Sequence, residues 1–458
     1  MSTSAAMAPR SSRNEALSLT ERLADLLARP VAPEIRARAA LHVLDWIGCA
    51  VLGAESPAGR IVARYGQNLG GGPCRAIGVG NRDAAGAAFV NGAYGNVLEM
   101  DDIHRTSILH PGPVVVPAAL ALAQRLNASP GEFLDAVVRG YDAVIRVGRS
   151  VGPGHYRHWH NTSTCGPFGA AAAAASLLGL DRSATVMALG HAGTQASGPW
   201  QCRLEGAMSK QLHTAAAAQA GLAAADLAAL GFTAPTQILD GALGFYAAMC
   251  PDPAPEAVLA DADGPWLITD TSFKPWPACR HAHPTIDAAL ALRDRVDVAA
   301  IDRIAVRSYA DAIGLCDNPN PTTVLEGKFS LQHCAAVVLL DGPPPLEAFE
   351  PTALARADVA ALRAKVRLEA AEPFAGAYPA HYGAGLTVRL ADGQEYSAEA
   401  PDALGDPDNP ISPVAVQDKA RMLMRAAGLA ADRIEAIIAA VDALPSGGAI
   451  RDVVNLLP

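Results

Sequence analysis

Apolar residues recur at three- and four-residue spacing along the first half of the chain, from Leu17 to about Tyr246. Between residues 34 and 52, for example, alanine, leucine, isoleucine and valine return at this interval, which marks one face of an amphipathic helix. Proline and glycine residues, such as Pro111 and Gly166, divide the pattern into separate helices. Because no convincing two-residue alternation interrupts it, this part of the chain is predicted to be all helical.

The pattern changes after about residue 266. Residues 301–308 (IDRIAVRS) and 365–369 (KVRLE) alternate apolar and polar side chains as half-buried strands do. Residues 386–397 carry Asp392-Gly393 between two β-type runs, which is a strong hairpin signal. Helical spacing then returns over residues 414–444. A segment of mixed α and β structure is therefore predicted between two helical ends.

These patterns predict a mainly α fold with two domains. A large all-helical domain is formed by both chain ends, residues 1–265 and 405–458, and a smaller α+β domain, residues 266–404, is inserted between them. Half of the 458 residues are hydrophobic but only 5% are aromatic, so the core is expected to consist largely of Ala, Leu and Val. Such small side chains favour closely packed helices.

Composition excludes several classes of protein. The formal net charge is -10 and no block of Lys and Arg stands out, which argues against nucleic-acid binding. The apolar runs are too short for a bilayer, so no membrane role is expected. The 8 cysteines form no C-x-x-C pair and no export signal precedes them, as in a cytoplasmic protein with reduced thiols. The Ser- and Arg-rich first 17 residues leave a mitochondrial transit peptide as the alternative.

Lysine is rare in this chain. Only five of the 36 basic residues are lysines, namely Lys210, Lys274, Lys328, Lys365 and Lys419. A compositional bias toward arginine would explain the rarity. Alternatively, lysine persists where an arginine fork is chemically unsuitable, because the two side chains are not interchangeable at a site.

Two polar segments lie directly before apolar helices. Residues 98–113 contain Glu99, Asp101, Asp102, His104 and His110. Titratable groups at a helix entry suit an anionic ligand or proton transfer, although an ordinary acidic loop with capping Asp residues would look the same. Residues 155–169 contain three histidines, at positions 155, 158 and 160. Their spacing matches no helical metal-binding signature and no carboxylate follows, so hydrogen-bonded histidines are favoured over a metal site.

Two further segments carry basic residues. In residues 207–214 (AMSKQLHT), Lys210, His213 and Thr214 fall on one face if a helix begins near Ser209, and such a face could bind a carboxylate. The alternative is a lysine that only extends along the helix surface. Residues 272–287 (SFKPWPACRHAHPTID) place their basic side chains where the two predicted domains meet, which is where sites often form. These side chains are Lys274, Arg280, His281 and His283. A basic linker between domains is the alternative.

The common cofactor and hydrolase motifs are missing from the sequence. There is no G-x-G-x-x-G, no P-loop, no G-x-S-x-G and no H-E-x-x-H. Acid-base chemistry on a small anion, using His and Lys without a cofactor, is the function class that remains.

Taken together, these segments resemble the 2-methylcitrate dehydratase (MmgE/PrpD) family. The resemblance rests on LEMDDIHRTSILHPGP, HNTSTCGPFG, AMSKQLHTAAAA, SFKPWPACRHAHPTID and GDPDNPIS, which follow the order of that family and span roughly residues 17–455. It implies a cofactor-independent cytoplasmic homodimer with a helical domain and a smaller α+β lid domain. The family includes 2-methylcitrate dehydratases, cis-aconitate decarboxylases and iminodisuccinate epimerases.

The resemblance also implies roles for individual residues. His110, His160, Lys210 and Lys274 match catalytic positions of the family. The implied substrate-binding residues are Glu99, Asp101, Asp102, His213, Arg280 and His283, with no metal ligand among them. The chain departs from the decarboxylase-like pattern, because it has Glu99 for Asp, Ile103 for Thr and Cys279 for His, and one extra residue before His110.

The resemblance implies a lyase that removes a proton next to a carboxylate of a di- or tricarboxylic acid. Fixed lysines can stabilise the resulting charge, and a histidine can serve as base. Dehydration of a 2-methylcitrate-like acid is the first hypothesis. Epimerisation or decarboxylation of a related acid, such as iminodisuccinate or cis-aconitate, is the alternative, because these reactions diverge only after the carbanion forms. Two further hypotheses come from other functional classes. One is a non-catalytic helical dimer that binds a carboxylate, and the other is a metal-dependent hydrolase that uses His155, His158 and His160.

Overall fold

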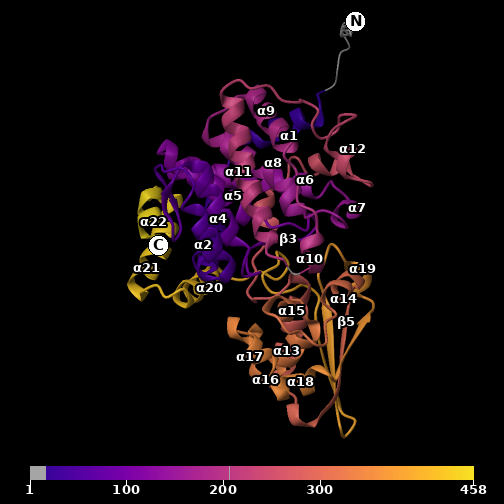
Figure 1. Ribbon diagram of the computed structural model, residues 1–458. Helices are drawn as coiled ribbons and strands as arrows, with labels where there is room; N and C mark the ends of the chain where they lie inside the picture. Colours follow the sequence, from indigo (N-terminus) through magenta and orange to yellow (C-terminus); the bar gives the residue numbers. More distant parts are fainter. Residues whose placement is uncertain (1–16, 206) are drawn as a thin grey trace, which may run out of the picture.

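The computed structural model describes residues 17–205 and 207–458, which form a large helical body and a smaller part built on a β-sheet (Figure 1). The first half of the chain, indigo to magenta, and the yellow C-terminal helices make up the helical body. The orange segment between them forms the smaller part. Residues 1–16, which carry most of the possible transit peptide, lie outside the described residues.

The helical body is organised around two central helices. α8 (Asn161–Leu177) packs against α6 (Pro130–Gly148), α11 (Ser209–Ala229), α5 (Gly112–Leu126) and α9 (Arg182–Gly193). α2 (Pro33–Glu55) packs against the C-terminal α20 (Pro413–Ala426) and against α4 (Ala84–Gly95). The remaining helices of this body are α1 (Leu19–Leu27), α3 (Pro57–Gly66), α7 (Pro153–Tyr156), α10 (Gln201–Glu205), α12 (Phe245–Met249), α21 (Ala431–Ala443) and α22 (Ile450–Leu456).

Local sequence signals explain where several helices begin and how closely they pack. Ser18 and Ser129 start α1 and α6 with capping boxes, in which each serine and the glutamate three residues later satisfy free backbone N–H groups. Gly140 of α6 and Gly169 of α8 let two backbones touch. A Cβ at Gly140 would lie 2.9 Å from the Gly169 carbonyl oxygen, and one at Gly169 would lie 2.8 Å from that of Gly140.

The smaller part contains a four-stranded mixed sheet with the order β6-β5-β7-β8. β5 (Ile301–Ser308) pairs in parallel with β6 (Val366–Ala370) and antiparallel with β7 (Ala384–Leu390), which pairs antiparallel with β8 (Glu395–Ala400). The hairpin predicted from Asp392-Gly393 is confirmed, because Arg389 pairs with Glu395 across a turn in which Gly393 has a φ of +88°.

Helices cover this sheet. α13 (His283–Arg293) packs against β7, β8 and α16 (Leu331–Asp341). Shorter helices complete the part: α14 (Ala310–Cys316), α15 (Val324–Lys328), α17 (Pro351–Leu354), α18 (Ala357–Arg363) and α19 (Phe374–Ala377). The 3-10 helices of the chain are η1 (Pro255–Leu259), η2 (Leu267–Asp270), η3 (Arg280–Ala282), η4 (Val298–Ala300), η5 (Leu346–Phe349) and η6 (Leu444–Ser446).

The prediction of a mainly α fold with an all-helical large domain is wrong. The structure is 58% helical and is a mixed α/β fold, with the four-stranded sheet and two smaller sheets. β1 (Cys74–Ala76) and β2 (Gly80–Arg82) form a hairpin inside the region predicted to be all helical, and β3 (Ile103–His104) pairs with β4 (Thr271–Ser272). Strands of two or three residues are too short to produce a readable alternation, so the sequence pattern could not reveal them.

The described residues contain two large hydrophobic clusters. One combines residues between 19 and 268 with residues 420–457, and the other lies within residues 278–400. α2 is long and apolar enough to cross a membrane by length and composition, but 78% of its apolar window is buried in the protein. α2 is therefore a buried central helix of the first cluster.

Candidate active site

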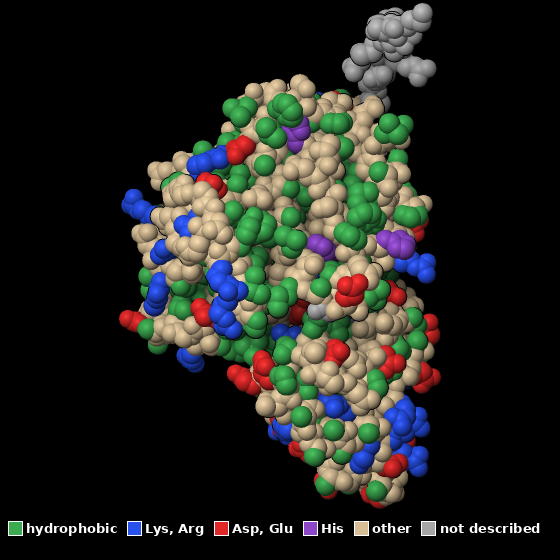
Figure 2. Space-filling model, in the orientation of Figure 1, with side chains coloured by type: hydrophobic (Ala, Val, Ile, Leu, Met, Phe, Trp, Pro, Cys, Tyr) green, Lys and Arg blue, Asp and Glu red, His purple; other side chains and the backbone are tan. Residues whose placement is uncertain are grey.

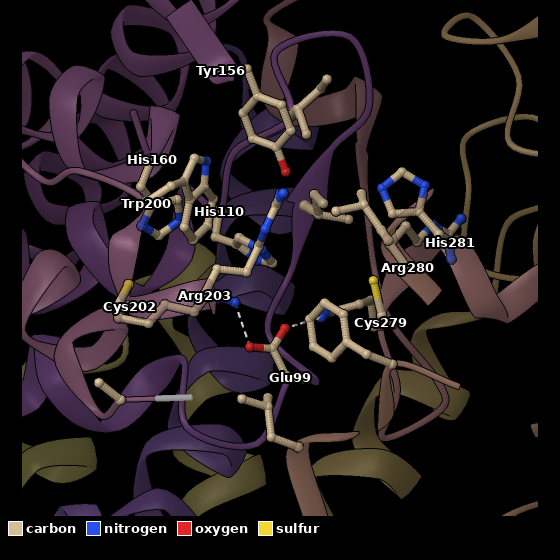
Figure 3. Close-up of a pocket in the computed structure, with 18 residues that line it drawn as sticks. Glu99, His110, Tyr156, His160, Trp200, Cys202, Arg203, Cys279, Arg280 and His281 are labelled. Atoms are coloured by element: carbon tan, nitrogen blue, oxygen red, sulfur yellow. Dashed lines mark hydrogen bonds and ion pairs between the residues drawn. The ribbon is translucent and has the colours of Figure 1, made fainter. Parts of the chain in front are cut away.

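Four side chains that the sequence singles out border one cavity. His110, His160, Lys210 and Lys274 line a space of about 90 Å³ whose other walls come from both parts of the fold (Figure 3). The space-filling view shows the molecule narrowing where these two parts meet (Figure 2). The cavity therefore lies at the junction between the helical body and the sheet-containing part, and it is small.

Each of the four side chains is placed by the start of a helix or by a short strand. His110 precedes α5, His160 directly precedes α8, and Lys210 lies in the first turn of α11. Lys274 follows β4, and the pairing of β4 with β3 ties it to the loop that carries His110. Helix starts present free N–H groups and positive dipole ends, so this arrangement favours anions.

Glu99 lies between the two lysines. Its carboxylate accepts a hydrogen bond from the Lys210 ammonium and lies 3.7 Å from Lys274 Nζ, as the dashed lines in Figure 3 mark. Asp101 lies 4.0 Å from Lys274 Nζ. Burial alone would raise the pKa of Glu99, but Lys210 and Lys274 outweigh it and lower that pKa below its usual value. The two ammonium groups are thus balanced by two carboxylates.

Lysine contacts converge on residues 98–101. Lys328 donates to the Leu98 carbonyl at 2.8 Å, and Lys419 donates to the Met100 carbonyl and to Asp45. Together with Lys210 and Lys274, four of the five lysines in the chain contact this short segment. Glu99 has a φ of +58°. Backbone strain of this kind persists only where surrounding contacts hold it, and it gathers at functional sites.

His110 has a defined tautomer. Its Nδ1 lies 2.9 Å from the Asp101 carboxylate and 2.9 Å from the Asp102 carbonyl oxygen. Both neighbours can only accept hydrogen bonds, so Nδ1 carries the proton and Nε2 of the neutral ring is free to accept one. Burial raises the pKa of Asp101, but His110 and Lys274 lower it well below its usual range. The ionised Asp101 therefore stabilises a charged His110 ring.

His160 is a neutral imidazole. Its Nδ1 lies 3.1 Å from Nδ1 of His213, and its ring lies over Trp200 with 4.3 Å between ring centroids. Burial and the nearby Lys210 lower the pKa of His160 well below its usual value, and the same causes lower the pKa of His213 to about 4. Since His213 occupies Nδ1, only Nε2 of His160 is available to a ligand. His213 itself does not line the cavity and instead positions His160.

The other predicted residues divide between the cavity and the structure around it. Glu99 and Arg280 line the cavity, whereas Asp101 lies behind His110 and Lys274. Asp102 does not reach the cavity, and its carboxylate accepts hydrogen bonds from His42, Tyr141 and the Gly112 backbone. His283 donates from Nε2 to the Ala278 carbonyl oxygen at 3.2 Å and does not reach the cavity.

Asp102 illustrates a polar residue with a packing role. Its carboxylate accepts from His42 Nδ1 at 2.7 Å, from the Tyr141 hydroxyl at 2.6 Å and from the Gly112 N–H at 2.9 Å. These bonds fix the loop to α2 and α6 and hold the first turn of α5. Asp102 therefore acts on the site only through the position of His110.

Sequence reasoning missed much of the cavity wall. Tyr156, Trp200, Cys202 and Arg203 are polar or aromatic lining residues that the sequence analysis does not name, and His281 also lines the cavity although it was named only as a basic side chain of its segment. The segment GPWQCR, with an aromatic and a charged residue in a Gly/Pro context before the Lys210 helix, was the available signal. The apolar lining residues Ile103, Ile108, Leu315, Leu325 and Phe329 offer no such signal, because isolated apolar residues occur throughout the chain.

The three histidines at 155, 158 and 160 do not converge as metal ligands would. His155 donates from Nδ1 to the Met249 carbonyl and contacts Thr164 through Nε2, both at 2.9 Å. Among the described residues, the group with metal-ligand spacing is instead His381, Asp402 and Asp408. Arg105 already pairs with both of those carboxylates.

Comparison with known proteins identifies the family of the chain. Residues 18–257 match the MmgE/PrpD N-terminal domain and residues 276–443 match the MmgE/PrpD C-terminal domain. The chain is 28% identical to the cis-aconitate decarboxylase-like protein oryM of Aspergillus oryzae over 97% of both proteins. It is 28% identical to cis-aconitate decarboxylase of Homo sapiens, over 83% of this chain and 81% of that protein. It is 26% identical to cis-aconitate decarboxylase of Aspergillus terreus, over 69% of this chain and 70% of that protein. The chain belongs to the MmgE/PrpD family and is an enzyme of that family.

Proposed function

We propose that this enzyme is a cofactor-independent lyase that forms a carbanion next to a carboxylate of a small di- or tricarboxylic acid. The observation that carries the proposal is the convergence of two ammonium groups and two imidazoles on one small cavity. A C–H next to a carboxylate is weakly acidic, and its removal places negative charge on the carboxylate oxygens. Fixed positive charges in a cavity that holds little water stabilise this charge.

In this proposal Lys210 and Lys274 bind the carboxylate on which charge develops. They are already held by Glu99 and Asp101, so little reorganisation accompanies the reaction. His110 is the general base, because its free Nε2 accepts the proton and the Asp101 carboxylate stabilises the ring that results. His160, neutral and aligned by His213, hydrogen-bonds to the departing or receiving oxygen through Nε2.

Dehydration of a 2-methylcitrate-like acid fits this arrangement. His110 takes the proton from carbon and, as the charged ring, returns it to the hydroxyl on the neighbouring carbon, which leaves as water while the carbon–carbon double bond forms. The second candidate is decarboxylation of a cis-aconitate-like acid. It is favoured by the activity named for the relatives, whereas Glu99, Ile103 and Cys279 depart from the decarboxylase-like pattern.

Incubation of the purified enzyme with four acids in deuterated water separates the candidates by NMR. Loss of the hydroxyl from 2-methylcitrate or citrate, giving an unsaturated acid, is the expected result. Release of carbon dioxide from cis-aconitate with deuterium at one product carbon would assign decarboxylation instead. Deuterium exchange in iminodisuccinate with inversion would assign epimerisation. No exchange, elimination or decarboxylation with any of these acids would refute the proposed lyase.

A further inference from the structure

The charges lining the cavity are balanced with one exception. Lys210 pairs with Glu99, and Lys274 lies near Glu99 and Asp101. Arg280 pairs with Asp406. Arg203 is the exception, because it makes no ion pair or side-chain hydrogen bond with any residue in the described part of the chain. Among the described residues of the cavity wall, Arg203 is therefore the basic side chain whose charge no protein carboxylate offsets.

Arg203 is also placed to reach a ligand in this cavity. It belongs to α10, which directly follows Trp200, and its guanidinium carbon lies 5.7 Å from the centre of the Trp200 ring. Figure 3 shows its side chain extending toward the Tyr156 hydroxyl. The positive charge of Arg203 acts on Tyr156, where it opposes the rise in pKa that burial causes, so the two groups are neighbours.

Tyr156 is a second donor without a partner. Its hydroxyl makes no hydrogen bond to another described residue, although burial raises its pKa and keeps the phenol protonated. Tyr156 and Arg203 both line a second, adjoining cavity of about 650 Å³. Their side chains therefore lie between the small cavity and the larger adjoining cavity.

We infer that Arg203 and Tyr156 form a subsite for a substrate carboxylate remote from the reacting carbon. The inference rests on the proposed function, because it takes the substrate to be a di- or tricarboxylate. A guanidinium binds a carboxylate through two parallel N–H donors, and a phenol adds a third hydrogen bond. With one carboxylate at Lys210 and Lys274 and another at Arg203, the acid is held at two points. The subsite thus selects acids with two or more separated carboxylates.

Binding of a non-reacting acid tests the subsite independently of turnover. Tricarballylate is a saturated tricarboxylate without a hydroxyl group, so it cannot be dehydrated. By isothermal titration calorimetry, Arg203→Gln should bind it about 10-fold or more weakly than wild type, as expected for lost hydrogen bonds to a charged group. Arg203→Lys should fall between them, because it keeps the charge but loses the fork. Binding of propionate, which has one carboxylate, should be unchanged.

Arg157→Gln is the matched control. Arg157 is exposed, lines the adjoining cavity and not the small one, and carries the same charge. Its substitution should change tricarballylate binding by less than about 2-fold, because both arginines are exposed but only Arg203 borders the small cavity in which the acid is held. An equal loss in Arg157→Gln and Arg203→Gln would show a general charge effect and overturn the subsite. Circular dichroism confirms that each variant is folded.

The outcomes separate this inference from the proposed function. If Arg203→Gln binds tricarballylate as wild type does, the subsite is wrong even when the enzyme turns over a polycarboxylate. If Arg203→Gln loses binding while wild type turns over none of the four acids, the subsite stands and the proposed lyase fails. If wild type binds neither tricarballylate nor the dicarboxylate glutarate, the subsite is wrong, and turnover of the four acids alone decides whether the proposed lyase stands.

Discussion

At the scale of single residues, the site depends on the ion pairs of Lys210 and Lys274 with Glu99. A lysine presents one compact ammonium group at the end of a flexible stem, whereas arginine presents a wide planar fork. Four lysines contact residues 98–101. Because each ammonium group is compact, four of them can reach this short segment, where four planar guanidinium groups would need more space. Lysine is rare in this chain, and four of its five lysines contact this one segment.

The role of Lys210 can be tested by Lys210→Ala. We expect turnover to fall by about 100-fold or more, because removing one preorganised charge donor typically costs this much. Stability should change far less, since the Lys210 side chain remains partly accessible at the cavity and Lys274 still faces Glu99. Turnover and thermal unfolding are measured on the same preparation.

Lys365→Ala is the control for that variant. Lys365 lies in the sheet-containing part and donates to the Ile301 carbonyl at 2.5 Å, away from the cavity lining. Its removal should leave turnover near the wild-type level. Wild-type turnover in Lys210→Ala would remove Lys210 from the reaction.

At the scale of elements, the helical body depends on backbones that pack very closely. α8 is almost entirely Ala, Gly and other small residues along its buried length, and it packs against α6 and α11 on different sides. Small side chains bury little area each, so close approach and dense packing supply contacts that large side chains would otherwise make. The helix starts that carry His160 and Lys210 are positioned by this packing.

Gly140→Ala tests the contact between α6 and α8. An added Cβ would lie 2.4 Å from Val115 Cγ1 and 2.9 Å from the Gly169 carbonyl oxygen, so atoms must move. We expect a loss of about 1–3 kcal/mol in the free energy of unfolding by urea, the usual cost of overpacking a core. Gly131→Ala in the same helix has no atom within 4 Å of the new Cβ and should be neutral or slightly stabilising. Equal effects of the two substitutions would contradict the packing account.

At the scale of the whole molecule, buried histidines couple stability to pH. Burial lowers the pKa of His42, His213 and His333 to about 4 and that of His281 to about 3. In the unfolded chain a histidine titrates near about 6.5. Between these values the unfolded state binds protons that the native state does not, so acidification favours unfolding.

We therefore expect the free energy of unfolding to fall as the pH drops from about 6.5 toward 4. Burial raises the pKa of Asp45 to about 6, which acts in the opposite direction because the native state binds that proton first. Asp287 and Asp442 act in the same direction as Asp45, but the buried histidines with a lowered pKa outnumber these three carboxyl groups, because they also include His104, His155, His160 and His283. Urea unfolding at several pH values measures the slope, and His333→Gln, which removes one such group outside the cavity, should make it shallower. A stability that stays constant or rises on acidification would refute this prediction.

The second prediction at this scale concerns assembly, and we propose a homodimer. Large apolar side chains are exposed on and next to α10 and α11, including Leu204 at 76%, Leu230 at 85% and Phe232 at 60% exposure. Figure 2 shows apolar side chains over the helical body, and exposed apolar surface of this kind is often covered by another subunit. Light scattering at micromolar concentration should give twice the monomer mass. A monomeric mass would contradict the proposal.

The sequence predicted the cavity unevenly. The polar segments pointed to His110, His160, Lys210 and Lys274 among other residues, the family resemblance selected these four, and the structure brings all four to one cavity. The same reasoning grouped Asp102 and His283 with them, yet both make their bonds within the surrounding structure. Tyr156 and Arg203 were not predicted, because in segment 155–169 the histidines drew attention and the segment GPWQCR matches no known motif. Segment-level signals identify a polar loop but do not show which way each side chain points.

By itself, the sequence determined the features that depend on neighbours a few residues apart. Helical periodicity and the Asp392-Gly393 turn are local, because they follow from backbone geometry over one or two turns. Tertiary structure alone decided the small sheet of β3 and β4, since these strands come from segments 167 or more residues apart in the register Ile103 with Ser272 and His104 with Thr271. It also decided that Glu99 meets both Lys210 and Lys274. Which distant segments pair depends on the packing of the whole core, and no local sequence pattern specifies that packing.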